Sequence, residues 1–411
     1  MDFVFWVCLV FSISNLEFYE VIMKLSDRIK LVKPSVTLAV TAKAKALKAK
    51  GVNVISFAAG EPDFDTPTFV KTAAKAAIDS GKTKYTPSIG TLALREAVCK
   101  ELSSIQGLKY KPEQIIVSSG AKHSLYNIFQ AICGKDDEVI IPSPYWVSYP
   151  EMVRLASGKP VFVDTKASDG FKLNIETLES KINKNTKAII LNSPSNPTGA
   201  VYDEETLRQI AELALKNQII VISDEIYKTL LYNGKKHVSI ASLGDDIKKL
   251  TIVVDGVSKA YSMTGWRIGY LASDMQEIVG GIKNIQSHST SNPSSISQEA
   301  AFCALTSKES AKAIEDMRSE FESRRDYMVE NLNKIPGLTC IKPEGAFYCF
   351  CDISKTKMDS LTFANQILDK ESVAVIPGVA FGWPTHIRLS FATGIDDIEE
   401  GIKRIGKFIN E

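Results

Sequence analysis

Six short runs rich in Ile and Val recur along the chain, and segments with helical periodicity separate them. The runs are "QIIVSS" (114–119), "EVIIP" (138–142), "PVFVD" (160–164), "KAIILN" (187–192), "QIIVIS" (218–223) and "LTIVV" (250–254). A strand that is apolar on both faces must be covered by helices on both sides. The pattern therefore predicts an α/β fold whose mainly parallel sheet is sandwiched by helices.

The 411 residues are long enough for one large and one smaller domain. After about residue 305 a long charged helical pattern, "SAKAIEDMRSEFESRRDYMVENLNKI", leads into short strands such as "AFYCFCD" and "HIRLSF". We expect a large domain over 68–304 and a small α+β domain over 305–411. Residues 23–67 are predicted to form an N-terminal arm and part of the small domain.

The first 22 residues are predicted to be an extension outside the fold. The apolar run "FVFWVCLVF" (3–11) follows Asp2 rather than a basic segment, and it has about half the length of a membrane span. No small-residue cleavage site follows it, and Met23 would be an ordinary cytosolic start. A targeting role for 1–22 stays open, but a cytoplasmic protein is expected.

Charge and cysteine content exclude several classes of partner. The 49 basic and 48 acidic side chains give a net charge of +1, so no global field favours nucleic acid or an anionic membrane. The seven cysteines show neither the spacing of a zinc site nor a disulfide framework, and we expect reduced thiols and no metal.

Polar residues follow several of the predicted strands. In an open parallel sheet, ligands gather where strands end. Gly120, Ala121 and Lys122 follow the first run and open a helical pattern, while Asn196 lies in "SPSNPTG" after the fourth run. Asp224 and Tyr227 follow the fifth run, and Lys259 follows the sixth.

These residue types suggest a phosphate, a ring nitrogen and a reactive amine. A glycine turn at a helix N-terminus binds anions, and Arg267 in "TGWRIG" could add a charged contact. A part-buried Asp224 needs a positive partner, which is either Lys259 in an ion pair or a protonated heterocyclic nitrogen. In the second case Lys259 is free to form a Schiff base. Together these features describe pyridoxal 5'-phosphate.

From about residue 23 to 411 the sequence resembles the class I/II aminotransferases of the fold-type I pyridoxal-phosphate enzymes. It is most similar to the bacterial-type aspartate aminotransferases, some of which also act on prephenate. The motifs that carry the resemblance are "AAGEPDFDTP" (58–67), "KYTPSIGTLALREAV" (84–98), "PYWVSYPEMV" (144–153), "SPSNPTGA" (193–200), "SDEIY" (223–227), "SKAYSMTGWRIGY" (258–270) and "IRLSFA" (387–392).

The resemblance implies how the cofactor is held. Lys259 would form the Schiff base and move the proton at the substrate Cα. Asp224 would keep the ring nitrogen protonated, and Tyr227 and Asn196 would donate to the phenolic oxygen. Further cofactor contacts are implied for Trp146, which stacks on the ring, and for Gly120, Ala121, Lys122, Ser258, Arg267 and Tyr85.

The resemblance also implies how substrate binds and how the chain assembles. Arg388 would grip the α-carboxylate; the alternation of Ile387, Leu389 and Phe391 with Arg388 agrees, because it turns the arginine away from the apolar face. Trp146 and Asn196 would contact substrate too, and the backbone of Gly60 would lie against it. Tyr85 and the segment around Asn292 match positions that a second subunit lends, which implies a homodimer.

Two departures bear on the substrate. Many relatives have serine at the position of Gly256, so Ser258, Lys122 and Arg267 would have to hold the phosphate. The arginine that binds the distal carboxylate in the animal and enteric enzymes would fall near Ser287. Lys122 is then the expected cation for that carboxylate, and Lys33 matches a position associated with prephenate use, although it could equally be a solvated lysine.

We therefore expect transamination between aspartate and 2-oxoglutarate, with prephenate as a further amino acceptor. The same fold also hosts aminotransferases for aromatic or alanine-like substrates and C–S β-lyases. A nicotinamide dehydrogenase is disfavoured because no G-x-G-x-x-G follows an early strand.

Overall fold

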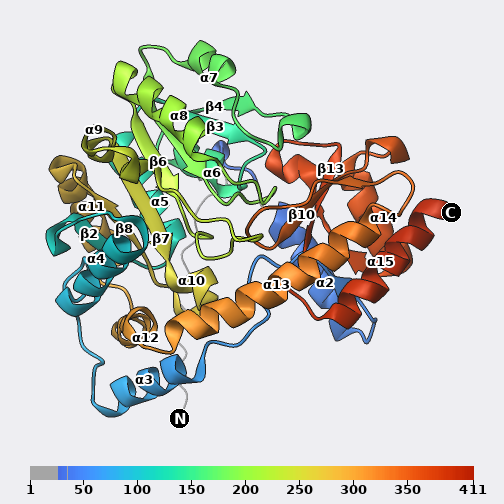
Figure 1. The fold of residues 1–411 in the computed structure, drawn as a ribbon, viewed down its shortest axis with the longest axis horizontal. Helices are drawn as coiled ribbons and strands as arrows, with labels where there is room; N and C mark the ends of the chain where they lie inside the picture. The colour runs from blue at the N-terminus through green and yellow to red at the C-terminus, as the bar shows by residue number, and fades with distance from the viewer. Residues whose placement is uncertain (1–25, 35) are drawn as a thin grey trace, which may run out of the picture.

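In the computed structural model, residues 26–34 and 36–411 are described. The predictions for residues 1–22 and for Met23 lie outside the described residues. Figure 1 shows two parts, a larger one around a central sheet and a smaller one that holds the C-terminus.

A seven-stranded sheet is the centre of the larger part (Figure 1). In spatial order its strands are β2 (Ile115–Ser118), β8 (Gly269–Ser273), β7 (Thr251–Gly256), β6 (Ile220–Asp224), β5 (Thr186–Asn192), β3 (Glu138–Ser143) and β4 (Lys159–Asp164). Only β8 runs antiparallel to its neighbours. The predicted mainly parallel sheet and its six Ile/Val-rich strands are confirmed; β8 was not among the predicted strands.

Helices cover both faces of this sheet, which explains why the strands are apolar throughout. In β6, Ile222 packs against α5, α6 and α11, whereas Val221 packs on the other side against α8. The helices of the larger part are α3 (Thr68–Asp79), α4 (Leu92–Gln106), α5 (Ala121–Ile132), α6 (Ser148–Leu155), α7 (Ile175–Lys181), α8 (Glu204–Asn217), α9 (Asp245–Lys249), α10 (Val257–Ala260), α11 (Gln276–Ser289) and α12 (Ser295–Thr306).

The smaller part contains a four-stranded antiparallel sheet and a short two-stranded parallel one. The first has the order β12 (Ile376–Pro377), β13 (His386–Ser390), β10 (Tyr348–Asp352) and β9 (Thr339–Cys340). The second pairs β1 (Ile55–Ser56) with β11 (Val373–Ala374). The helices here are α1 (Asp27–Lys30), α2 (Val36–Ala49), α13 (Ser310–Leu332), α14 (Ser360–Glu371) and α15 (Ile395–Asn410).

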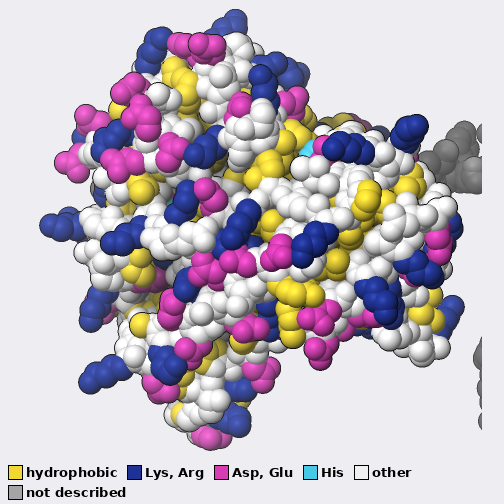
Figure 2. Space-filling view, turned by 45° about the vertical axis from the view of Figure 1, so that its right-hand side comes forward, with side chains coloured by type: hydrophobic (Ala, Val, Ile, Leu, Met, Phe, Trp, Pro, Cys, Tyr) yellow, Lys and Arg dark blue, Asp and Glu magenta, His cyan; other side chains and the backbone are white. Residues whose placement is uncertain are grey.

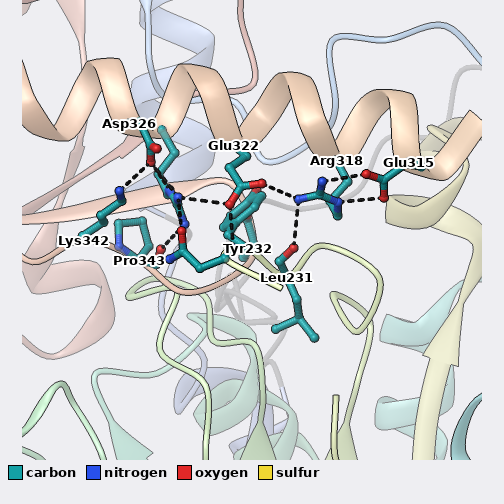
Figure 3. A network of polar contacts seen from close by, with 11 residues as sticks. Leu231, Tyr232, Glu315, Arg318, Glu322, Asp326, Lys342 and Pro343 are labelled. Carbon is teal, nitrogen blue, oxygen red and sulfur yellow. Dashed lines mark hydrogen bonds and ion pairs between the residues drawn. The ribbon is translucent and has the colours of Figure 1, made fainter. Parts of the chain in front are cut away.

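Helix α13 spans the two parts and is held by buried and half-buried charges (Figure 3). Arg318 binds Glu315 and Glu322 on the same helix and also donates to the carbonyl of Leu231, in the segment that follows β6. Arg325 is fully buried and donates to the Pro343 carbonyl. These contacts fix the loop after β6 against the smaller part.

The two parts share buried side chains at this junction. Tyr227, Leu230 and Tyr232, which follow β6, belong to the same apolar cluster as Phe347 and Phe391. The division of the chain at residues 67/68 and 304/305 therefore stays a prediction.

Basic and acidic side chains are interspersed on the face shown in Figure 2. Among residues 26–34 and 36–411, no helix combines the length and the apolar character needed to cross a membrane.

Candidate active site

A cavity of about 730 Å³ lies where β5, β6 and β7 end and meet β10, β13 and α2. It brings together residues from both parts of the molecule. The sequence-predicted site residues that line it are Gly60, Ala121, Lys122, Trp146, Asn196, Asp224, Tyr227, Ser258, Lys259, Arg267 and Arg388.

Lys259 lies on the short helix α10, directly after β7, and its amine points into this cavity. Its Nζ donates to the Gly60 carbonyl at 2.5 Å. Burial lowers the pKa of Lys259 to about 8, helped by the charges of Arg388 and Arg267 and opposed by those of Glu61 and Asp224. The uncharged amine, which a nucleophile requires, is therefore more populated near neutral pH than in an ordinary lysine.

Asp224 ends β6 as a buried carboxylate without a cation. Tyr149 donates to its Oδ2 at 2.6 Å, and the backbone N–H of Ile226 donates to Oδ1 at 3.3 Å. Within the described part of the chain no cation lies within ion-pair distance, so the ion pair with Lys259 that the sequence left open is not formed. Burial raises the pKa of Asp224 to about 7, which the Tyr149 hydrogen bond opposes.

The N-terminus of the twelve-residue helix α5 and Arg267 adjoin the same end of the cavity. Gly120 caps the helix with a φ of 92°. A Cβ there would collide with the Arg267 guanidinium, which donates to the carbonyls of Ser119 at 3.3 Å and Thr264 at 2.9 Å. Because Gly120 has no Cβ, the Arg267 guanidinium can lie close to the N-terminus of α5. The guanidinium and the free backbone N–H groups of this helix end together form an anion site.

Lys122 and Trp146 form a cation–π pair on the cavity wall. The Lys122 Nζ lies 4.8 Å from the centre of the Trp146 ring. Burial, and then the charge of Arg267, lowers the pKa of Lys122. Trp146 is only half-buried. Its ring contacts Tyr149, which in turn donates a hydrogen bond to Asp224.

Arg388 is a buried guanidinium without a carboxylate. It projects from β13, donates from Nη1 to Asn196 at 3.0 Å and from Nη2 to the Ala58 carbonyl at 3.1 Å, and its Nε has no partner in the described structure. The Tyr348 ring lies 4.3 Å from its Cζ. Burial lowers the pKa of Arg388. Such a group is suited to an incoming anion.

Tyr227 completes this wall from the turn after β6. Its hydroxyl lies 2.9 Å from that of Tyr348, and both rings are buried. The backbone of Asn196 is fixed by a hydrogen bond, which its N–H donates to the side-chain oxygen of Asn192 at 2.8 Å.

Tyr85 and Lys33 do not line this cavity. Tyr85 is 90% exposed. Lys33 is exposed, and its backbone N–H donates to Glu151 at 3.1 Å. Asn292 and Ser287 also lie elsewhere, each bonded to a backbone carbonyl nearby. The roles assigned to Tyr85 and Lys33 stay predictions.

Sequence reasoning missed three features of the site. Tyr149 lies within the quoted "PYWVSYPEMV" motif, but only the fold shows that it faces Asp224. Tyr348 was part of an apolar run and gave no polar signal. Helix α2 contributes a wall of the cavity that includes Thr41, Lys45 and Lys48, and no motif in this segment had indicated a part of the site.

Comparison with known proteins agrees with this geometry. The family model "Aminotransferase class I and II" matches residues 52–405. An aspartate aminotransferase of Bacillus subtilis (strain 168) is 48% identical over 394 residues, which cover 95% of this chain and 100% of that protein. An aspartate/prephenate aminotransferase of Nitrosomonas europaea is 44% identical over 94% of this chain and 100% of its own length.

A solved structure, an aspartate aminotransferase from Thermus thermophilus with maleate, superimposes with a TM-score of 0.90. It is 43% identical and covers 93% of this chain and 99% of its own. Sequence, fold and site thus agree, and the chain belongs to the class I and II aminotransferases, a fold-type I family that uses pyridoxal 5'-phosphate.

Proposed function

We propose that this enzyme transfers the amino group between aspartate and 2-oxoglutarate, and also aminates prephenate to arogenate. One observation carries the proposal: a single cavity holds a buried guanidinium without a carboxylate, a buried carboxylate without a cation and an amine of lowered pKa. Substrate and cofactor would supply the missing partners. The names of the relatives described above, aspartate and aspartate/prephenate aminotransferase, support this choice of substrates.

The residues present fit pyridoxal 5'-phosphate. Asp224 would hold a protonated ring nitrogen, which supplies the cation that this carboxylate lacks. The N-terminus of α5, with Arg267 and Ser258, would hold the phosphate. Trp146 would cover one face of the ring, and Lys259 would bind it covalently. When bound, the cofactor supplies an electron sink for the bond that breaks at the substrate Cα.

Arg388 and Lys259 would perform complementary tasks on the substrate. The free Nε of Arg388, together with an Nη group, would bind the α-carboxylate in a bidentate way and so fix the orientation of the Cα–H bond. The uncharged Nζ of Lys259 would accept the proton that leaves Cα. Tyr227 and Asn196 would keep the wall beside Arg388 polar, and Tyr149 would keep Asp224 in position.

Lys122 would bind the distal carboxylate. Ser287 lies outside the cavity, so no side chain at that position takes part, whereas Lys122 lines the cavity and its Nζ stands above Trp146. A flexible ammonium accepts carboxylates at differing distances, which suits both aspartate and the larger prephenate. Lys33, on the segment before α2, would assist prephenate only.

We also propose that the enzyme is a cytoplasmic homodimer. Tyr85 is a 90% exposed aromatic side chain, a residue type enriched in protein interfaces, which supports the proposal that it completes the site of a partner. The cysteines of the described residues are free thiols, which suits a reducing compartment.

The test is kcat/KM for aspartate, glutamate, prephenate, phenylpyruvate and alanine, on the parent and on Lys122→Ala and Lys33→Ala. We expect the dicarboxylates to lead. Lys122→Ala should lower kcat/KM for them by about 10- to 100-fold, because a hydrogen bond to a charged group contributes about 1.5–3 kcal/mol. Lys33→Ala should affect prephenate alone.

Two outcomes would contradict the proposal. If alanine or aromatic substrates outpace the dicarboxylates and Lys122→Ala leaves the order unchanged, the substrate assignment is wrong. If turnover of an amino acid ignores the 2-oxo acid acceptor and releases pyruvate or ammonia, the enzyme is a lyase.

A further inference from the structure

Helix α2 turns one polar face toward the cavity. Thr41, Lys45 and Lys48 line the cavity, and spacings of four and three residues place them on one side of an α-helix. Val40 and Ala44 of the same helix are buried in an apolar cluster of the smaller part, and Ala44 also adjoins the cavity. Figure 1 shows α2 beside the helices of the smaller part. The helix is therefore fixed, and its two lysines lie at the rim rather than at a random place on the surface.

Neither rim lysine has a carboxylate partner among residues 26–34 and 36–411. Lys43 of the same helix, by contrast, pairs with Asp369 at 2.7 Å. Both Lys45 and Lys48 are exposed. Their charges are thus available to a solute that approaches the cavity.

The charged side chains that line the cavity are mainly basic. The basic ones are Lys45, Lys48, Lys122, Lys259, Arg267 and Arg388, and the acidic ones are Glu61 and Asp224. Glu61 accepts a hydrogen bond from Thr264, and the proposed function gives Asp224 to the cofactor. That function also uses the four basic groups other than Lys45 and Lys48, so the two lysines of α2 remain without a task.

We propose that Lys45 and Lys48 form a cationic rim that attracts acidic amino acids and 2-oxo diacids, and raises kcat/KM for them over neutral amino acids. This inference rests on the proposed function. The inference predicts an order of effects, because the substrates differ in net charge. 2-Oxoglutarate carries two net negative charges, aspartate carries one, and alanine carries none. An attraction that acts before contact must follow this order, whereas a contact within the pocket need not.

The expected size follows from Coulomb attraction in water. One pair of unit charges about 10 Å apart changes local concentration by about twofold at low salt. Loss of both lysines should therefore lower kcat/KM by about fourfold for aspartate and by more than about tenfold for 2-oxoglutarate. Salt at high concentration should remove these differences, because it screens charges over this distance.

The experiment compares the holoenzyme variant Lys45→Gln/Lys48→Gln with a matched control, Lys43→Gln/Lys50→Gln. The control removes two positive charges from the same helix and its end, but neither residue lines the cavity. Each half-reaction with aspartate, 2-oxoglutarate and alanine is followed by the absorbance of the cofactor at low and high ionic strength. We expect losses in the order 2-oxoglutarate, aspartate, alanine, only in the rim variant and only at low salt, with kcat unchanged.

Equal losses in the control, an equal loss for alanine, or losses that persist at high salt would overturn the inference. The single variants Lys45→Gln and Lys48→Gln, with thermal unfolding as a check, separate charge from damage to α2. The proposed function is tested separately by the parent: if the parent does not prefer aspartate to alanine, that function fails. If the parent does and the rim variant matches it, only the rim inference fails.

Discussion

Asp224 shows how a single residue can be costly for folding and essential for the reaction. Its carboxyl group is buried beside Tyr149 without a cation among the described residues, and burial raises its pKa to about 7. Between its ordinary pKa and pH 7, the folded chain therefore holds a proton that the unfolded chain has released. The contribution of Asp224 to the stability of the cofactor-free protein therefore falls as pH rises through this range.

We predict that Asp224→Asn makes the cofactor-free protein more stable while it removes activity. At pH 8 its free energy of unfolding should exceed that of the parent by about 1–4 kcal/mol, and the gap should narrow toward pH 5. Turnover of the holoenzyme should fall by several orders of magnitude, since Asn cannot keep the ring nitrogen protonated. Denaturant unfolding at several pH values and single-turnover kinetics test this. A stable variant with activity within a few-fold of the parent would remove Asp224 from the cofactor site.

Strands β6 and β7 lead into the two segments that carry the catalytic residues, and a buried cluster of charges joins these segments. Lys228 lies four residues after Asp224, and Asp255 lies four residues before Lys259. The Lys228 Nζ lies 2.5 Å from Asp255 and 2.9 Å from Glu101. Burial disfavours the lysine charge, but the two carboxylates outweigh this and raise the pKa of Lys228. Behind the site, this charge cluster thus joins the turn after β6 to the end of β7.

Lys228→Met should lower the free energy of unfolding by about 3–5 kcal/mol, because it leaves Glu101 and Asp255 buried without a cation. Lys249→Met, which removes a lysine from an exposed pair with Asp246, is the control and should change stability little. Chemical denaturation measures both variants. If Lys228→Met unfolds at the same denaturant concentration as the parent, the prediction is wrong. Glu101 or Asp255 would then be neutralised by a proton in place of the lysine.

Prediction from sequence succeeded for elements that the core alone dictates. The runs that became β3 and β5 have continuous apolar stretches, Val-Ile-Ile and Ala-Ile-Ile-Leu, because both faces are covered. Strand β8 was missed because packing demands small residues there: a Cβ on Gly269 would collide with the backbone at Gly120 and Ala121. A weak strand signal is the consequence of that close approach.

The site divides in the same way. Residues that follow strands, such as Asp224 and Lys259, could be collected from sequence because parallel strands end at one edge. Tyr348 and the rim lysine Lys45 could not be assigned to the site from sequence. They reach the cavity from the smaller part, and no periodic pattern in the sequence indicates how the two parts pack together.

The proposed homodimer, in which Tyr85 completes the site of the partner, can be tested on the whole assembly. We predict that Lys259→Ala and Tyr85→Ala are each nearly inactive, and that a mixture of the two regains activity after subunit exchange. Random exchange of equal amounts should restore about a quarter of the parental activity, since half of the dimers then contain one intact site. Activity is measured before and after exchange. No recovery, with dimers present, would place Tyr85 in the site of its own chain or in none.

The pairing of β1 with β11 joins positions near the two ends of the chain, Ile55 with Val373 and Ser56 with Ala374. During synthesis β1 has no strand to pair with until more than three hundred further residues have been made, whereas β2 to β8 are complete by Ser273. The order of translation therefore separates the two halves of the active site in time. The strands that bear Asp224 and precede Lys259 can assemble first, and Arg388 joins them only after more than a hundred further residues have been made.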